Sequence, residues 1–248
     1  MKVIILAGGK GSRISEYTRK IPKPMIRIIG KPMLHHIINI FSAQNFNKFY
    51  IATGYKSNEI KNYFKKFKRN KNIFFLDKAK KKELEINFID TGLNTNTGGR
   101  LKRLKKYFNK KEDFMLTYGD GMSNINLKKL KLLHLKKKKI GTVTAVRPLS
   151  KYGVLKISNG LALSFKEKKQ LNVGWINGGF FVLNYKIFNF LKNDKTVLEK
   201  IPLEVIAKKK QLNAYKHKGF WQCVDTKRDK EYLENSIKEK KLPWENIN

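Results

Sequence analysis

Two aspartates stand directly after apolar runs of the sequence. Asp120 follows the run 114–119, and Asp225 follows the run 220–224. A carboxylate at the carboxyl end of a buried strand is well placed to hold Mg²⁺, which takes one or two carboxylates and leaves its other positions to water and phosphate. A helix N-cap is the alternative role, and it suits Asp225 because Thr226 and a helical pattern follow. Both interpretations stay open for Asp225 at this point.

A glycine-rich segment near the start of the chain has the composition of a phosphate-binding loop. The apolar run Val3–Leu6 predicts a buried strand, and residues 7–13 follow it with the sequence AGGKGSR. Three glycines let backbone N–H groups turn toward an anion, and Arg13 adds a cation that suits phosphate oxygens. The spacing matches neither of the two commonest phosphate-loop signatures. A plain strand-to-helix turn is therefore the alternative interpretation.

Further polar groups lie near these segments. The prolines of Ile21–Met25 predict an extended segment, which would hold Lys23 where the glycine loop ends. Glu167-Lys168 follows a strand-like run and could contact a phosphorylated, hydroxyl-rich ligand, or form a charged turn. Glycines inside the strand around Asn177-Gly178-Gly179 indicate a bulge or the close approach of a ligand. His134 and His217 have no plausible partners, and the sequence favours a buried Cys223 over a nucleophile.

Composition limits the class of protein. The chain has 248 residues, one cysteine, and 55 basic against 19 acidic residues, a net charge of +36. The single cysteine excludes an internal disulfide framework and a cysteine-cluster metal site, and it favours a cytoplasmic location. The sequence has no membrane-spanning run. Its basic residues are mostly lysines spread over every predicted helix, without a nucleic-acid-binding signature, so a nucleic-acid partner is not expected. The charge predicts attraction of small polyanions such as nucleotides.

The elements that position these residues alternate along the first half of the chain. Strands are predicted at Ile26–Ile29, Lys48–Thr53, Ile73–Leu76, Ile86–Ile89 and Phe114–Tyr118, and helices at 32–44, 57–67, 100–108 and 125–138. This succession argues for a doubly wound α/β sheet with a ligand crevice at the carboxyl ends of its strands. From Gly141 onward strands predominate, and we expect an extension of the same sheet there.

The ordered set of motifs resembles the sugar-phosphate nucleotidyltransferase family, most closely its glucose-1-phosphate cytidylyltransferase branch. The resemblance runs from Met1 to about Trp244. It rests on LAGGKGSR (6–13), PKPM (22–25), GYK (54–56), TGGRLKR (97–103), TYGDG (117–121), EK (167–168), INGGFFVLN (176–184) and GFWQ-x-x-DT (219–226). Ser12 stands where the family usually has threonine, and Lys169 where it usually has proline.

The resemblance implies a fold and an activity. It implies one Rossmann-like nucleotidyltransferase domain, with a nucleotide-binding half at about 1–140 and a smaller sugar-phosphate-binding half at about 141–248. The implied reaction joins CTP and glucose 1-phosphate into CDP-glucose and pyrophosphate, with Mg²⁺ as the cofactor, in a homo-oligomer. Another nucleotidyltransferase that uses UTP or dTTP is the near alternative. A non-catalytic nucleotide- or nucleic-acid-binding protein is the distant one.

The resemblance also implies roles for individual residues. The catalytic set would be Arg13, Lys23, Asp120 and Asp225, of which the two aspartates would bind the metal. The glycine-loop positions that would follow the nucleotide are Leu6, Ala7, Gly8, Gly9, Lys10 and Gly11. Ser12, Arg13 and Lys23 would hold phosphates, Thr95 and Arg100 would lie near the nucleotide, and Gly119 beside the ribose. Glu167, Lys168 and Gly179 would contact the sugar phosphate.

Overall fold

Strand β1 (Val3–Leu6) lies in the middle of the molecule because all four of its side chains are apolar. Each of them is at most 7% exposed. The strand pairs in parallel with β4 (Lys48–Thr53) on one side and β8 (Asp113–Tyr118) on the other. Successive side chains of a strand point to opposite faces, so Val3 and Ile5 enter one apolar core and Ile4 and Leu6 enter the other. A buried sheet with cores on both faces follows from this one segment.

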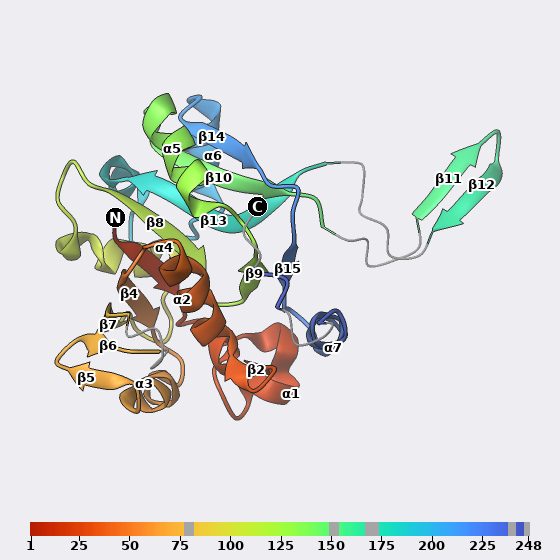
Figure 1. Cartoon of the computed structure of the whole chain (residues 1–248). Coiled ribbons are helices and arrows are strands. Elements are labelled where there is room, and N and C mark those ends of the chain that lie inside the picture. The colour runs from red at the N-terminus through yellow and green to blue at the C-terminus, as the bar shows by residue number, and fades with distance from the viewer. Residues whose placement is uncertain (77–81, 149–153, 167–173, 238–241, 246–248) are drawn as a thin grey trace.

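The computed structural model describes residues 1–76, 82–148, 154–166, 174–237 and 242–245 (Figure 1). Nine strands form one mixed sheet in the order β14-β10-β13-β8-β1-β4-β7-β6-β5. The remaining strands of this sheet are β5 (Lys68–Asn70), β6 (Ile73–Phe74), β7 (Leu84–Asp90), β10 (Gly141–Val146), β13 (Ile176–Asn184) and β14 (Leu212–Lys216). Shorter pairs are β2 (Arg27–Ile28) with β3 (Lys31–Pro32), β9 (Gly121–Ser123) with β15 (Trp221–Cys223), and β11 (Val154–Ser158) with β12 (Leu161–Lys166).

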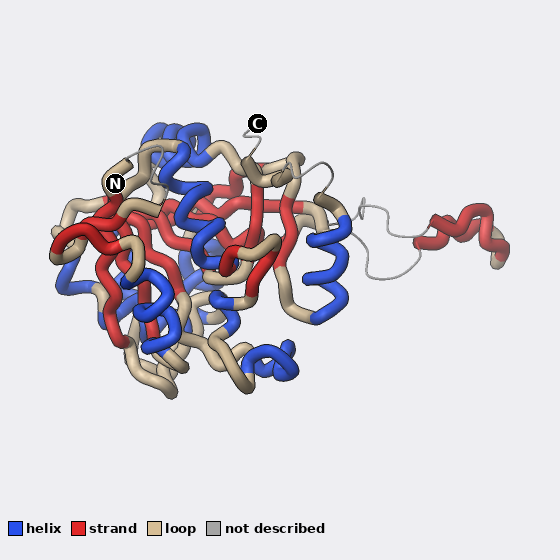
Figure 2. Tube along the Cα trace, turned by 60° about the horizontal axis from the view of Figure 1, so that its bottom comes forward, coloured by secondary structure: helices blue, strands red, loops and turns tan. Residues whose placement is uncertain are grey.

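Helices cover both faces of the large sheet (Figure 2). The core on the side of Val3 and Ile5 includes residues of α2 (Met33–Ala43), α3 (Ser57–Lys65), α5 (Leu127–Lys137) and α7 (Lys227–Asn235). The opposite core includes residues of α4 (Thr97–Arg103), the 3-10 helix η4 (Tyr185–Phe190) and α6 (Ile201–Lys208). The short elements are α1 (Ser15–Thr18) and the 3-10 helices η1 (Ser12–Ile14), η2 (Lys23–Met25) and η3 (Lys105–Tyr107). The predicted α/β class is confirmed.

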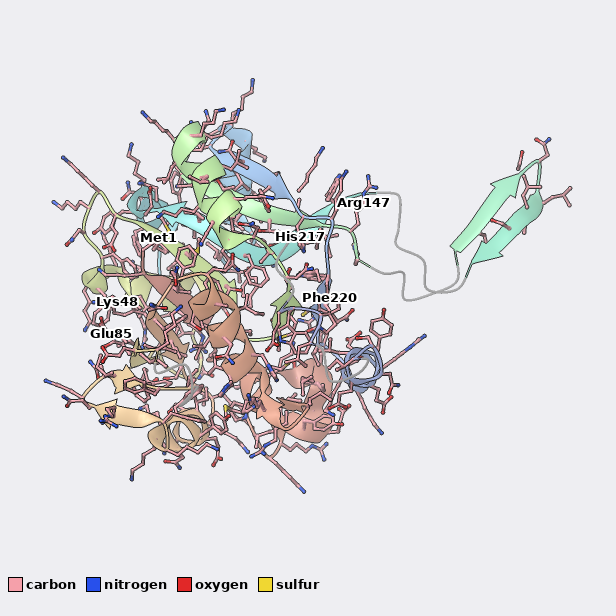
Figure 3. The ribbon with its side chains drawn as sticks, viewed as in Figure 1. Met1, Lys48, Glu85, Arg147, His217 and Phe220 are labelled. Carbon is pink, nitrogen blue, oxygen red and sulfur yellow. The ribbon has the colours of Figure 1, made fainter. Side chains whose placement is uncertain are left out.

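The strand directions bring several loops to one edge of the sheet. β1, β4, β7 and β8 run parallel, so the segments that follow them all leave at their carboxyl ends. β13 runs antiparallel to β8, with Phe180 opposite Thr117, and its first residues therefore lie at the same edge. Ligand crevices of α/β sheets lie at such an edge. Neighbouring strands are also joined by side chains: Lys48 and Glu85, paired in the β4–β7 register, form an ion pair of 2.7 Å (Figure 3).

Two features differ from the arrangement that the sequence predicts. The hairpin β11–β12 lies apart from the main body (Figure 1), and it carries three exposed leucines, Leu155, Leu161 and Leu163. The predicted helix at 100–108 begins earlier, at Thr97, and ends at Arg103, where the 3-10 helix η3 takes over. Among the described residues, no helix is long and apolar enough to cross a membrane.

Candidate active site

A cavity of about 650 Å³ opens at the carboxyl edge of the sheet. Its walls come from segments far apart in the sequence: the glycine loop after β1, the start of α4, the turn after β8, the start of β13 and the strand β15. The sequence-predicted residues that line it are Leu6, Ala7, Gly8, Gly9, Gly11, Ser12, Arg13, Lys23, Thr95, Arg100, Gly119, Asp120, Gly179 and Asp225. Lys10 is exposed and is not part of this lining, while Glu167 and Lys168 lie outside the described residues.

Arg100 holds the glycine loop in place through a hydrogen bond to a backbone carbonyl of the loop. The residue is 3% exposed, and its guanidinium donates hydrogen bonds to the carbonyl oxygens of Gly8 (2.8 Å) and Gly92 (2.7 Å) and to Thr91 Oγ1 (2.7 Å). A further bond of 3.2 Å reaches the carbonyl of Thr53. Burial lowers the pKa of Arg100, but an arginine stays protonated in proteins. One buried cation therefore joins the loops after β1, β4 and β7.

The same contact explains the glycine at position 8. A Cβ on Gly8 would lie 2.2 Å from Arg100 Nη1, and one on Gly54 would lie 2.5 Å from the same atom. Both positions exclude a side chain because the guanidinium fills that space. Sequence reasoning placed Arg100 near a nucleotide. The structure shows that Arg100 binds the loop's own carbonyls, so it supports the loop that faces the cavity.

Lys23 stands between the two aspartates. Its ammonium donates to Asp120 Oδ2 and to Asp225 Oδ1, both at 2.6 Å, and its side chain is 10% exposed. Burial alone would lower the pKa of Lys23, but the charge of Asp120 and the hydrogen bonds to both carboxylates outweigh burial and raise the pKa. The ammonium is therefore charged, and the two carboxylates converge on a single cationic centre. Arg13 joins this cluster through a 2.8 Å bond from Nη1 to Asp225 Oδ2.

Two short strands bring the aspartates together across more than 100 residues. β9 begins directly after Asp120, and it pairs with β15, with Cys223 opposite Gly121. The Val224 N–H donates to the Asp120 carbonyl at 3.1 Å, which extends the pairing to the residue before Asp225. The turn after β8 and the turn after β15 are therefore held side by side, and both carboxylates reach the cavity.

The helix that follows Asp225 decides between the two roles considered for this residue. The N-cap of α7 is Thr226, whose Oγ1 accepts from the Asp229 N–H, while the Asp229 carboxylate accepts from the Thr226 N–H. This capping box satisfies the first turn of the helix. The side chain of Asp225 is directed to Lys23 and Arg13 instead. The N-cap interpretation of Asp225 is therefore wrong.

Several residues of the cavity wall were not among the predicted site residues. Tyr118 donates its hydroxyl to Glu199 Oε1 at 2.5 Å, and Thr97 Oγ1 donates to Glu199 Oε2 at 2.6 Å. Burial, reinforced by the nearby Glu199 charge, raises the pKa of Tyr118. Trp221 lines the wall and donates from Nε1 to the Gly178 carbonyl at 2.7 Å. Only the folded arrangement brings these side chains together, because they come from β8, α4, β15 and the segment before α6.

Cys223 also lines the cavity, which the sequence did not indicate. Its Sγ and one oxygen each of Asp120 and Asp225 all lie within 4.8 Å of one another. Burial raises the pKa of the Cys223 thiol, and the charge of Asp120 adds to this effect. The protein's one cysteine is thus a neutral thiol beside two carboxylates.

The histidines lie elsewhere and are structural. His134 Nδ1 is 2.9 Å from Thr142 Oγ1, and its other ring nitrogen is 3.6 Å from Asp113 Oδ1. His217 Nε2 is 3.2 Å from Ser123 Oγ and 3.0 Å from the carbonyl of Phe220. Both residues lie on the segment between β14 and β15, where Figure 3 labels them. The expectation that these two histidines lack partners is therefore wrong, because each meets a polar group from a segment that the sequence could not place beside it.

The geometry suits one kind of chemistry. The cavity combines a glycine loop, the cations of Arg13 and Lys23, and two converging carboxylates. Such a loop and such cations bind phosphate oxygens, and paired carboxylates bind a divalent cation. A polyphosphate bound with a divalent cation would satisfy all three sets of groups at once.

Known proteins are similar to this chain in sequence and in fold. The family model described as "Nucleotidyl transferase" matches residues 2–239. The chain is 40% identical over 253 residues to the glucose-1-phosphate cytidylyltransferase of Salmonella typhi, covering 98% of both chains. It is 42% identical to the probable glucose-1-phosphate cytidylyltransferase of Bacillus subtilis, covering 91% of this chain and 92% of the relative. The crystal structure of HddC from Yersinia pseudotuberculosis matches with a TM-score of 0.72 and 25% identity, covering 96% of this chain and 99% of that one.

Proposed function

Because this chain belongs to the nucleotidyl transferase family, we propose that it transfers a cytidylyl group from CTP to glucose 1-phosphate, giving CDP-glucose and pyrophosphate. The glucose-1-phosphate cytidylyltransferase of Salmonella typhi and the probable one of Bacillus subtilis match more than nine tenths of the chain, at 40% and 42% identity. The observation that carries the proposal is the cluster in which Asp120 and Asp225 converge on one cationic centre, in the cavity that the glycine loop also lines. The nucleotide half and the sugar-phosphate half of the site meet there.

The aspartate pair fits the divalent cation that this reaction calls for. Both carboxylates already hold a charged ammonium at 2.6 Å, so the space between them suits a cation. Asp120 and Asp225 would hold Mg²⁺ through oxygen ligands, with water and phosphate at its other positions. When bound, the ion would neutralise charge on the reacting phosphates. Lys23 would then be released from the carboxylates toward the phosphates.

The chain's own residues supply positioning and charge. A phosphate oxygen of glucose 1-phosphate forms a bond to the α-phosphorus of CTP, the bond from that phosphorus to the bridging oxygen breaks, and pyrophosphate leaves. The attacking phosphate is already ionised at neutral pH, so no strong general base is needed. Lys23 and Arg13 offset the charge of the leaving pyrophosphate, and the glycine loop aligns the triphosphate.

The remaining residue roles belong to the same proposal. Leu6–Gly11 follow the nucleotide with their backbone, Ser12 holds a phosphate, and Thr95 and Gly119 lie beside the nucleoside. Glu167, Lys168 and Gly179 bind the sugar phosphate. The division into a nucleotide half at about 1–140 and a sugar half at about 141–248, a cytoplasmic location and a homo-oligomeric assembly remain predictions.

Pyrophosphate release tests the proposed reaction. The protein is assayed with CTP, UTP, dTTP and GTP, each combined with glucose 1-phosphate, mannose 1-phosphate and galactose 1-phosphate. We expect the highest kcat/KM for CTP with glucose 1-phosphate, and we expect CDP-glucose as the product by mass spectrometry. A higher kcat/KM with UTP or dTTP would replace this proposal by the related nucleotidyltransferase. Tight nucleotide binding without turnover on any pair would favour a binding protein.

A further inference from the structure

The aspartate pair has a third donor of a different chemical kind. Cys223 Sγ lies within 4.8 Å of one carboxylate oxygen each of Asp120 and Asp225, and all three side chains are partly buried. The backbone fixes this arrangement, because Cys223 pairs with Gly121 in the β9–β15 register and the Val224 N–H bonds the Asp120 carbonyl. The β9–β15 pairing therefore holds the thiol beside both carboxylates.

The donor set discriminates between classes of metal. Mg²⁺ takes oxygen ligands only, so it would use the two carboxylates and leave the sulfur aside. Zinc, cadmium and cobalt bind thiolate together with carboxylate and accept fewer ligands. We propose that Asp120, Asp225 and the Cys223 thiolate together form a site for a thiophilic divalent cation, which competes there with Mg²⁺. This inference rests on the proposed function only in taking the two aspartates as the site of the catalytic cation.

Binding of such a cation changes the cluster in a defined way. The Lys23 ammonium now holds both carboxylates at 2.6 Å, so an entering cation displaces it. A metal–sulfur bond forms as the thiol releases its proton to the buffer, because the thiolate is the form that binds a metal. The two carboxylates and the thiolate carry three negative charges, which a divalent cation and Arg13 balance once the ammonium is displaced.

Cobalt is the probe for this site, because a cobalt–thiolate bond gives a charge-transfer band in the near ultraviolet. The full chain, reduced and free of nucleotide and sugar phosphate, is titrated with Co²⁺ under anaerobic conditions. Since the sequence has one cysteine, any such band comes from Cys223. We expect one saturable band in the wild-type protein, its absence in Cys223→Ser and Cys223→Ala, and an apparent affinity at least about tenfold weaker in Asp120→Asn.

Each outcome decides the proposal. A band that Mg²⁺ reverses and that Asp120→Asn weakens supports the shared site. No band at saturating Co²⁺, or a band that Asp120→Asn and Asp225→Asn leave unchanged, overturns it. Circular dichroism confirms that each variant is folded, and Glu231→Gln, an exposed carboxylate on α7, serves as the matched control with an unchanged titration. The readout needs no turnover, so its failure is separate from a failure of the cytidylyl transfer assay.

Discussion

Lys23 lies between the two carboxylates at which we propose that Mg²⁺ binds. Its ammonium bridges Asp120 and Asp225, and together with Arg13 it balances the two negative charges. Two carboxylates this close repel each other unless a cation lies between them. We infer that Lys23 is the counter-charge of this pair, and that a bound divalent cation would free it for the phosphates.

This arrangement predicts the effect of removing any member of the cluster. Asp120→Ala, Asp225→Ala and Lys23→Ala should each lose at least about a hundredfold in turnover, because each substitution removes a charged group that would hold the proposed metal or neutralise the reacting phosphates. Steady-state pyrophosphate release measures the loss, and circular dichroism checks folding. Glu231→Ala, an exposed carboxylate with only an i, i+4 partner, should keep wild-type turnover. A folded Asp225→Ala with normal turnover would remove that residue from the site.

Residue types and their order in the sequence predicted most members of this cluster, but not the contacts between them. The glycine loop and the two aspartates were identified from apolar runs that end in polar groups, and Lys23 from the prolines beside it. All of them line one cavity. Cys223 was expected to be simply buried, because its nearness to Asp120 depends on a pairing between residues about 100 positions apart. Local patterns contain no information on such a pairing.

At the scale of elements, length and periodicity decided what could be predicted. The strand Lys48–Thr53 has the predicted bounds, since it is a run with clear ends. β9 is three residues long, too short to show a period of two, and it exists only because β15 pairs with it. The antiparallel direction of β13 within a largely parallel region was equally invisible in the sequence.

Helix α5 carries a pH-sensitive contact with β10. Burial lowers the pKa of His134 below its ordinary value of 6.5, although the nearby Asp113 opposes this effect. The unfolded chain therefore takes up a proton before the folded one as the pH falls. The free energy of unfolding should be highest above about pH 6.5 and should decrease below it.

Urea unfolding at pH 7.5 and pH 5.5 measures this dependence. His134→Gln keeps a polar group opposite Thr142 and should show a smaller decrease in the free energy of unfolding between the two pH values than the wild type. His36 and His217, whose pKa values burial also lowers, account for the remainder. Lys136→Gln, an exposed change on the same helix, should leave the pH dependence as it is. An equal decrease in His134→Gln and wild type would contradict the assignment.

At the scale of the whole molecule, charge dominates. A net charge of +36 on 248 residues gives a positive electrostatic potential that attracts polyanions. Salt screens this field, with a Debye length of about 10 Å at 0.1 M and about 3 Å at 1 M. Contacts within the cavity are screened less, so they persist when the long-range attraction is lost.

Substrate kinetics at different salt concentrations test this charge effect. The KM for CTP should rise at least about threefold between 0.05 and 0.5 M potassium chloride, and the KM for glucose 1-phosphate should rise less because it carries fewer charges. The kcat should change little, since the reacting groups lie inside the cavity. A KM for CTP that does not change with salt would show that the surface lysines do not assist binding.

The buried guanidinium of Arg100 has a thermodynamic consequence. It ties the loops that end β1, β4 and β7 through their carbonyl oxygens before any nucleotide arrives. A loop that is already ordered loses little conformational entropy on association, so less of the gross interaction energy is spent on ordering the receptor. Nucleotide association should therefore be governed by desolvation and charge, with a bimolecular rate set by diffusion and encounter rather than by a slow rearrangement of the phosphate bed.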